Sequence, residues 1–344
     1  MKIVANLPNN DLNTVPEFIA RAEQAGFDGV TVAENAHNPF LPLAVAAVHS
    51  SRIELATGVA IAFPRSPMMM ANNAWDLQAA SNGRFVLGIG SQVKAHIERR
   101  FSTPWSAPAP RMRDYVQALH AIWATWTTGE PLNFEGQHYR FNLMTPNFTP
   151  EPIDAPPPPV KLSAVGPAML RLSGEVANGV SLHPFCTRDY ALNQILPRLG
   201  EGMERTGRRR EDFEISGGGF VATGATDEDV AMMVEWVRYR IGFYGSTRAY
   251  WPVLVEHGLE ELGQKLNEMS RRNEWDKMAG EITDDVVHLF AAVARHDQLP
   301  TAIAERFGGV ADSVAFTDPT LDPDLVTELK SIPTAFAGFP RRAR

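Results

Sequence analysis

The segment Ile53-Glu54-Leu55-Ala56-Thr57-Gly58-Val59-Ala60-Ile61 is an apolar run rich in strand-forming residues. A helix-forming segment follows it over 67–80, and 84–90 (Arg84-Phe85-Val86-Leu87-Gly88-Ile89-Gly90) is a second apolar run. Short apolar strands that lack polar alternation are typical of parallel sheets buried on both faces, and a helix between two of them allows parallel pairing. This stretch therefore predicts a βαβ unit of an α/β fold.

The same alternation extends in both directions along the 344 residues. Eight strands joined by helices match a closed (β/α)8 TIM barrel better than an open sheet, and we expect a single barrel domain over 1–344. Two Rossmann-like halves are the alternative that periodicity leaves open. We expect the strands at 3–5, 29–33, 53–61, 84–90, 160–165, 179–182, 213–222 and 313–316, and helices at 14–25, 42–50, 67–80, 111–126, 168–177, 189–205 and 227–239.

Two segments interrupt this rhythm. Between 128 and 159 the chain predicts a hairpin, with strands at 132–134 and 138–141, followed by a proline run. Between 240 and 309 a largely helical insertion, which includes a helix over 284–295, precedes the last strand. We interpret both as insertions within the barrel.

Composition narrows the class of partner and the compartment. The 32 Lys and Arg residues against 40 Asp and Glu give a net charge of −8, and basic groups such as 208–210 are short and scattered. An extended nucleic-acid surface is not expected from this pattern, and the predicted partner is a small molecule. A single cysteine, Cys186, fits a reducing cytoplasm, and the absence of any apolar run of about 18 residues predicts no membrane segment.

In a barrel of this kind the active site lies at the carboxyl ends of the strands. The histidines show none of the spacings typical of zinc sites, so no metal is expected. Neither Ser91 nor Cys186 lies in a nucleophile motif. The polar or aromatic residues that follow strands two, three, four and six are Glu34, Asn35, His37, Phe63, Arg65, Ser91, Gln92, Lys94, His96 and His183.

Four glycines carry more information. Gly88 and Gly90 end a strand, but a dinucleotide-binding fingerprint needs a third glycine that is absent, so a Rossmann-type NAD site is not expected. Gly166-Pro167 lies between the fifth strand and a helix, which leaves backbone amides around 166–168 free to bind a phosphate. Gly58 interrupts a strong strand, as at a bulge or a close approach to a ligand.

Four motifs lie at 57–60, 84–91, Ala164-Val165-Gly166-Pro167 and 170–179, and two more at 74–78 and 92–105. The first four together resemble the bacterial luciferase-like monooxygenase superfamily. Within that superfamily, the last two make the chain similar to the actinobacterial branch of coenzyme F-420-dependent oxidoreductases, and the likeness covers nearly the whole chain.

The resemblance implies a homodimeric luciferase-like barrel with a flavin or deazaflavin ring in its mouth. It places the cofactor phosphate near the fifth and sixth strands, beside Ala164, Val165, Gly166, Pro167 and Ala168, and a cis peptide bond at Gly58–Val59 behind the ring. Asn35, Ala60 and Ser91 complete the expected cofactor contacts. An acid and a histidine follow the second strand in deazaflavin relatives, whereas this chain has Glu34 and then Asn35; a glutamate after the fourth strand is replaced by Ser91.

We therefore expect a hydride-transfer enzyme that uses coenzyme F-420 and an organic substrate that the sequence does not identify. Glu34 and the histidines His37, His96 and His183 are the candidate acid/base residues, with His183 ranked first because it directly follows a strand. An FMN-dependent monooxygenase that uses oxygen and a non-catalytic flavin-binding barrel are the alternatives. Arg238, Arg240 and Arg248 are candidate partners for the acidic tail of F-420.

Overall fold

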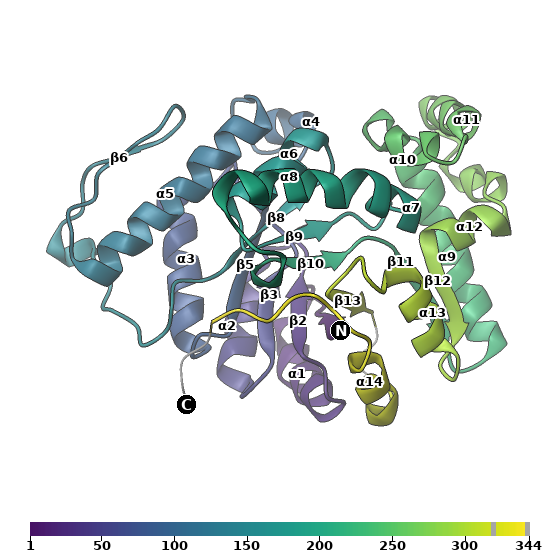
Figure 1. Cartoon of the computed structure of the whole chain (residues 1–344), viewed down its shortest axis with the longest axis horizontal. Helices are drawn as coiled ribbons and strands as arrows, with labels where there is room; N and C mark the ends of the chain where they lie inside the picture. Colours follow the sequence, from purple (N-terminus) through teal and green to yellow (C-terminus); the bar gives the residue numbers. More distant parts are fainter. Residues whose placement is uncertain (318–320, 341–344) are drawn as a thin grey trace.

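The computed structural model describes residues 1–317 and 321–340. Within them, eight parallel strand positions close into a barrel, because β3 pairs with β5 as well as with β2, and β13 joins β1 to β10 (Figure 1). This closure confirms the predicted TIM barrel over two open Rossmann-like sheets. The strands are β1 (Lys2–Asn6), β2 (Gly29–Val32), β3 (Glu54–Thr57) with its continuation β4 (Ala60–Ile61), β5 (Phe85–Gly90), β8 (Val160–Ala164), β9 (Gly179–Leu182), β10 (Glu214–Gly217) and β13 (Ser313–Phe316).

Helices cover the outside of the barrel, and their apolar faces pack on the strands. All six residues of β5 are buried, as expected for a strand covered on both faces. The surrounding helices are α1 (Val15–Gln24), α2 (Phe40–His49), α3 (Pro67–Ala80), α4 (Lys94–Arg99), α5 (Pro108–Thr128), α6 (Pro167–Val176), α7 (Arg188–Tyr190), which continues through a π-helical segment (Ala191–Ile195) into α8 (Leu196–Thr206), and α14 (Pro323–Lys330).

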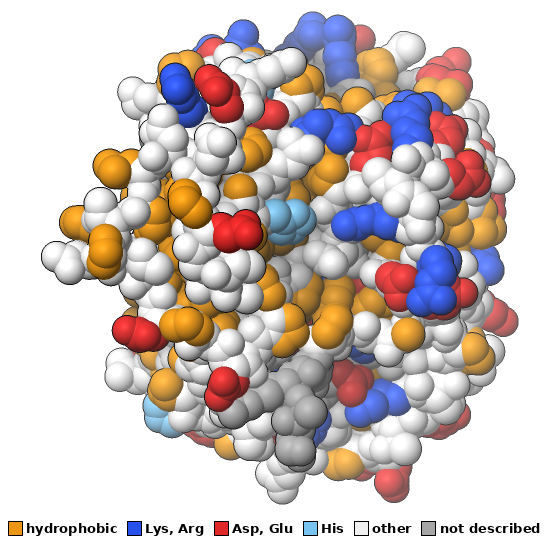
Figure 2. Space-filling view, turned by 60° about the vertical axis from the view of Figure 1, so that its left-hand side comes forward, with side chains coloured by type: hydrophobic (Ala, Val, Ile, Leu, Met, Phe, Trp, Pro, Cys, Tyr) orange, Lys and Arg blue, Asp and Glu red, His pale blue; other side chains and the backbone are white. Residues whose placement is uncertain are grey.

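The first insertion contains the predicted hairpin. Strands β6 (Phe134–Glu135) and β7 (Arg140–Phe141) pair antiparallel and project from the end of α5 (Figure 1). Leu143 and Phe148, which follow the hairpin, are 76% and 79% exposed. Figure 2 shows this face of the molecule, where hydrophobic side chains gather on one half and charges of both signs intermingle on the other.

The second insertion comprises the chain between β10 and β13, so it begins earlier than the predicted residue 240, and its secondary structure differs from the prediction in two places. The expected strand over 213–222 is broken at Gly217 and Gly218, which have φ of 75° and 97°, and the chain leaves the barrel to form β11 (Phe220–Gly224). The expected helix over 284–295 is wrong in its second half, because α12 (Asp284–Phe290) ends and β12 (Ala291–Arg295) pairs in parallel with β11. Helices α9 (Asp227–Gly245), α10 (Trp251–Val255), α11 (Glu260–Arg271) and α13 (Leu299–Phe307) complete the insertion.

A buried charge network closes the amino-terminal end of the barrel. Lys161 Nζ and Lys2 Nζ lie 2.5 and 2.9 Å from the Glu214 carboxylate, which is almost fully buried, and Lys2 also pairs with Glu54. Burial alone would raise the pKa of Glu214, but the two ammonium groups more than offset it and hold the pKa below its ordinary value. Phe336 and Phe339 of the carboxyl-terminal segment cover the lysines.

Gly174 of α6 and Gly202 of α8 allow these two helices to pack backbone against backbone. A Cβ atom on Gly202 would lie 2.0 Å from the Arg171 carbonyl oxygen, whereas one on Gly200 of the same helix would meet nothing within 4 Å. We expect Gly202→Ala to destabilise the protein by about 1–3 kcal/mol through overpacking. Gly200→Ala should instead stabilise it by about 0.5–1 kcal/mol, because alanine is the better helix former. Urea unfolding of the two variants checks the pair, and equal midpoints would contradict this packing.

None of the helices in the described ranges is both long enough and apolar enough to cross a membrane.

Candidate active site

The third strand is interrupted at the mouth of the barrel by a cis peptide bond between Gly58 and Val59, as the resemblance implied. The amide of Gly58 donates to the Val32 carbonyl (2.7 Å), and the amide of Glu34 donates to the Val59 carbonyl (3.3 Å). A Cβ atom on Gly58 would lie 2.1 Å from Thr31 Oγ1. Close approach of β2 therefore requires glycine at this position.

Gly88 and Gly90 of β5 make room for the same segment. A Cβ atom on Gly88 would lie 2.0 Å from the Thr57 carbonyl oxygen, and one on Gly90 would lie 3.0 Å from Val59 Cγ2. The Thr57 hydroxyl donates to the Gly88 carbonyl over 2.6 Å. The Gly-x-Gly pattern thus serves strand packing, which explains why it lacks the third glycine of a dinucleotide fingerprint.

Glu34 is held by the loop that follows β4. Its carboxylate forms a bidentate ion pair with Arg65 over 2.7 and 2.8 Å and also accepts from the Ile61 amide over 2.7 Å. The Glu34 side chain is only 7% exposed. A carboxylate bound by three donors has few lone pairs left for substrate, so this geometry favours a positioning role for Glu34 beside the cis segment.

The other residues predicted after the second and fourth strands lie on the rim. The Asn35 carbonyl accepts from Arg100 Nη2 over 2.5 Å, which ties this loop to α4. Ser91 is half-buried, and its hydroxyl donates to the Gln92 carbonyl over 3.2 Å. His37 and His96 are exposed, and neither side chain has a hydrogen bond or ring contact with another described residue. The three candidate histidines are therefore not brought into mutual contact.

The start of α6, where the sequence predicts a phosphate seat, is exposed. Gly166 caps α6 with φ of −82° and ψ of 158°, and within residues 1–317 and 321–340 the start of this helix has no side-chain cap. Gly166, Pro167 and Ala168 are exposed, and a Cβ atom on Gly166 would meet nothing within 4 Å. The amides at this helix start are thus accessible to an anion.

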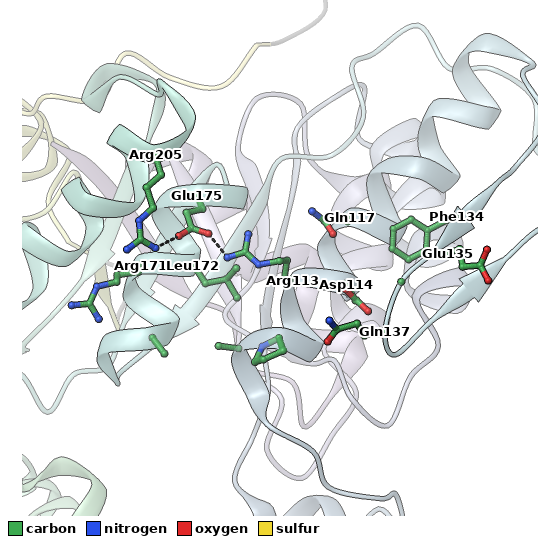
Figure 3. Close-up of a pocket in the computed structure, with 14 residues that line it drawn as sticks. Arg113, Asp114, Gln117, Phe134, Glu135, Gln137, Arg171, Leu172, Glu175 and Arg205 are labelled. Carbon is green, nitrogen blue, oxygen red and sulfur yellow. Dashed lines mark hydrogen bonds and ion pairs between the residues drawn. The ribbon is translucent and has the colours of Figure 1, made fainter.

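An open groove of about 870 Å³ begins at Ala168 and runs between α6, α5 and the hairpin (Figure 3). The carboxylate of Glu175 lies between the guanidinium groups of Arg113 and Arg205, so two cations share one buried anion. Burial would raise the pKa of Glu175, but the hydrogen bonds from these arginines lower it below its ordinary value. Arg171 also lines the groove and pairs with Glu201.

His183 lies in an aromatic box at the end of β9. Its ring centroid is 4.5 Å from the rings of both Tyr244 and Tyr250, edge-on to the first and tilted by 31° to the second. The Phe185 amide donates to His183 Nδ1 over 3.0 Å, so the neutral ring carries its proton on Nε2. Burial lowers the pKa of His183 to about 4. At neutral pH the side chain is thus an uncharged hydrogen-bond donor.

Sequence reasoning missed Tyr244 and Tyr250, which the second insertion contributes from the end of α9 and the 3-10 turn Arg248–Tyr250. Burial, with Tyr244 nearby, raises the pKa of Tyr250 to about 12, so its hydroxyl stays protonated. The signal that could have found them is the density of aromatic residues in this part of the insertion. Those residues are Trp236, Tyr239, Phe243, Tyr244, Tyr250 and Trp251.

The arginines predicted to bind the acidic tail of F-420 differ in whether they already form ion pairs. Arg238 is engaged by Glu235 and Asp284. Arg240 lies over the Trp236 ring and Arg248 over the Trp251 ring, and within residues 1–317 and 321–340 neither forms an ion pair. In the same ranges, no group of three or more His, Cys, Asp and Glu side chains is arranged to hold a metal ion.

A family model described as luciferase-like monooxygenase matches residues 3–313 of the chain. The chain belongs to the luciferase-like monooxygenase family. This family membership agrees with the closed barrel and with the cis bond in the third strand.

Relatives of this luciferase-like protein include coenzyme F-420-dependent oxidoreductases. An uncharacterized protein of Mycobacterium tuberculosis is 46% identical over 91% of this chain and 92% of its own length. The 5,10-methylenetetrahydromethanopterin reductase of Archaeoglobus fulgidus is 27% identical over 87% of each chain. A putative coenzyme F-420-dependent oxidoreductase of Mycobacterium tuberculosis is 29% identical over 79% of this chain and 81% of its own.

Solved structures of the same fold extend the comparison. The coenzyme F-420-dependent tetrahydromethanopterin reductase of Methanopyrus kandleri superposes with a TM-score of 0.75 at 20% identity, over 96% of each chain. A long-chain alkane monooxygenase superposes with a TM-score of 0.66 at 12% identity, over 96% of this chain and 89% of its own. At these identities the two structures support the luciferase-like fold alone.

Proposed function

We propose that this luciferase-like protein is a coenzyme F-420-dependent oxidoreductase that transfers a hydride between the deazaflavin ring carbon and an organic substrate. The observation that carries the proposal is the continuity of the α6 start with the arginine-lined groove. F-420 has an acidic tail beyond its phosphate, whereas FMN ends at the phosphate. A phosphate seat that opens into a groove with Arg171, Arg113 and Arg205 suits the longer cofactor, whose carboxylates would share these arginines with Glu175 and Glu201.

The residues of the mouth fit the remainder of such a cofactor. Gly58 of the third strand and Gly88 and Gly90 of β5 let the segment around Val59 pack closely against its neighbours, and the Glu34–Arg65 pair holds this segment in place. When bound, the deazaflavin supplies the hydride chemistry, and the protein supplies orientation and exclusion of water. The rim residues of α4 and the aromatic side chains of the second insertion provide that exclusion.

His183 has the properties needed to act on a substrate oxygen. Its Nε2 proton has no partner among the described residues, while Nδ1 is fixed by the Phe185 amide. When a hydride adds to a carbonyl carbon, negative charge develops on the oxygen, and a fixed neutral donor stabilises that charge. His183 therefore serves in our proposal as a hydrogen-bond donor to the substrate oxygen, with its orientation set by Tyr244 and Tyr250.

The activity is tested anaerobically with oxidised F-420 and a panel of secondary alcohols, and with reduced F-420 and a panel of ketones and activated alkenes. The proposal expects a change in cofactor absorbance that requires both the protein and one class of substrate. Deuterium from a labelled alcohol should appear on one face of the ring carbon. Oxygen consumption with reduced FMN, together with no reaction of F-420, would favour the monooxygenase alternative.

Gly166 provides a separate test of the phosphate seat. Gly166→Val should weaken F-420 binding at least about tenfold, or 1.4 kcal/mol, because the added side chain would cover the exposed amides of α6. The fold should be unaffected, since the site is open and its φ suits any residue. Gly280→Val, at a second open glycine, is the matched control and should leave affinity unchanged. Equal cofactor affinity in both variants would count against the seat.

A further inference from the structure

A second pocket lies on the outer side of the loop that carries His183. Its volume is about 290 Å³, and it lies between the start of α7, the segment 288–293 and α13. Alanine and valine side chains of 291–293 and Ala302 form an apolar wall. The polar residues of the lining are Thr187, Arg188, Asp189, His257, His288, Glu305 and Arg306.

Arg306 is the unusual member of this lining. Its side chain is buried, with the residue only 6% exposed, and Nη2 donates to the Gly218 carbonyl over 2.8 Å and to the Cys186 carbonyl. Nε and Nη1 are buried and have no hydrogen-bond partner, and within the described ranges no carboxylate forms an ion pair with Arg306. A buried charge without a counter-ion is costly, so an anion bound beside Arg306 would stabilise it.

A second guanidinium group lies in the same pocket. Arg188 donates through Nη1 to the Gly308 carbonyl over 2.8 Å and to the Arg306 carbonyl over 3.4 Å. Burial lowers the pKa of the Arg306 guanidinium below its ordinary value. The nearby charge of Arg188 lowers this pKa further, whereas Cys186 and Asp189 raise it. Asp189 and Glu305 are exposed, and in the part of the chain that the structure describes neither pairs with these arginines. The two cations therefore repel each other without a bridging anion.

Two histidines add hydrogen-bonding capacity. His257 Nε2 lies 2.7 Å from Thr187 Oγ1, which also accepts from the Tyr190 amide. His288 is exposed at the opening of the pocket. Two guanidinium groups, two imidazoles and an apolar wall, with the carboxylates of Asp189 and Glu305 exposed beside them, form a site that suits an oxyanion attached to a small organic body.

We propose that this pocket binds a small organic oxyanion, a phosphate or a carboxylate, at a site separate from the cofactor seat on α6. Arg188 and Arg306 supply the charge, and the apolar wall contacts the rest of the ligand. Because Thr187 and the Cys186 carbonyl belong to the loop after β9, the ligand also stabilises the segment that positions His183. This inference does not depend on the identity of the redox cofactor.

The full chain is titrated with sodium phosphate and, separately, with sodium acetate, at constant ionic strength balanced with chloride. Anion binding is measured by the shift in thermal unfolding temperature and by calorimetry. Arg188→Gln should weaken the apparent affinity at least tenfold. Arg271→Gln removes the same charge from an exposed position on α11 and should leave the affinity unchanged. Saturation by phosphate alone assigns a phosphate ester as the ligand class, and saturation by acetate alone assigns a carboxylate.

Three results would overturn the proposal. The first is that neither anion saturates the protein beyond the effect of chloride. The second is that Arg188→Gln and Arg271→Gln bind the anion with equal affinity. The third is loss of anion binding in Gly166→Val, which would assign the anion to the α6 start. Arg306→Gln is the second variant of the pocket, and it should also weaken anion binding. This substitution removes the hydrogen bonds to the Cys186 and Gly218 carbonyls as well. If Arg306→Gln does not fold, Arg188→Gln decides the outcome.

Discussion

His183→Ala should lower kcat by roughly 10²-fold, the usual cost of removing one fixed donor to a developing oxyanion. The affinity for the cofactor should change little, because His183 lies in the aromatic box and not at the start of α6. Single-turnover kinetics with reduced F-420 and an active ketone measure the chemical step directly. His37→Ala and His96→Ala, at exposed rim positions, are the matched variants.

The distribution of effects among the three histidines decides the assignment. A large loss only in His183→Ala supports the proposed donor. If all three variants retain full turnover, no rim histidine assists the reaction and the proposed role is wrong. His183→Phe keeps a ring between the two tyrosines but removes Nε2–H, so it should be as slow as the alanine variant while remaining more stable.

The pH dependence gives an independent check of the buried imidazole. The pKa of an unfolded histidine is about 6.5, whereas burial lowers the pKa of His183 to about 4 in the folded protein. Turnover should therefore stay flat on acidification through pH 6.5 and fall only near pH 4. Since the unfolded chain binds the proton first, the stability from this group is complete above pH 6.5 and is lost as the pH falls toward 4. His183→Phe should remove that part of the acid sensitivity.

Coenzyme F-420 should bind in its oxidised or reduced form, whereas FMN should not be retained on purification. A deazaflavin exchanges hydrides but reacts poorly with oxygen, and its tail carries carboxylates that the groove arginines can meet. Fluorescence titration with each cofactor measures the preference. Micromolar binding of FMN with no binding of F-420 would overturn the proposed function and favour the FMN-dependent monooxygenase alternative.

The contribution of the groove can be separated from that of the ring. Arg171→Gln should weaken the binding of F-420 with a long acidic tail more than that of a deazaflavin without a tail, because Arg171 lies on the groove and not at the mouth (Figure 3). The effect should shrink as salt is added, since exposed charges are screened. Equal effects on both ligands would place the tail elsewhere, for instance beside Arg240 or Arg248.

The sequence by itself determined the alternation of strands and helices, because that information is local, whereas the closure of the barrel rests on the pairing of β13 with β1 and β10. Each buried parallel strand must be a short apolar run, and each crossover must be a helix, so eight such units are visible without any knowledge of contacts. The glycine at 166 and the following proline likewise predicted the exposed helix start by local rules. The Gly58–Val59 cis bond came from the family resemblance and not from the pattern of residues.

Tertiary structure decided what depends on a distant partner. The Ala-rich run 291–295 has no strand signal of its own and becomes β12 because β11 lies beside it. Glu34 is bound by Arg65 across 31 residues, and His183 is enclosed by Tyr244 and Tyr250 from an insertion more than 60 residues away. Burial lowers the pKa of His183 to about 4. The position of His183 after a predicted strand could not reveal this shift, because burial is a property of the packed molecule.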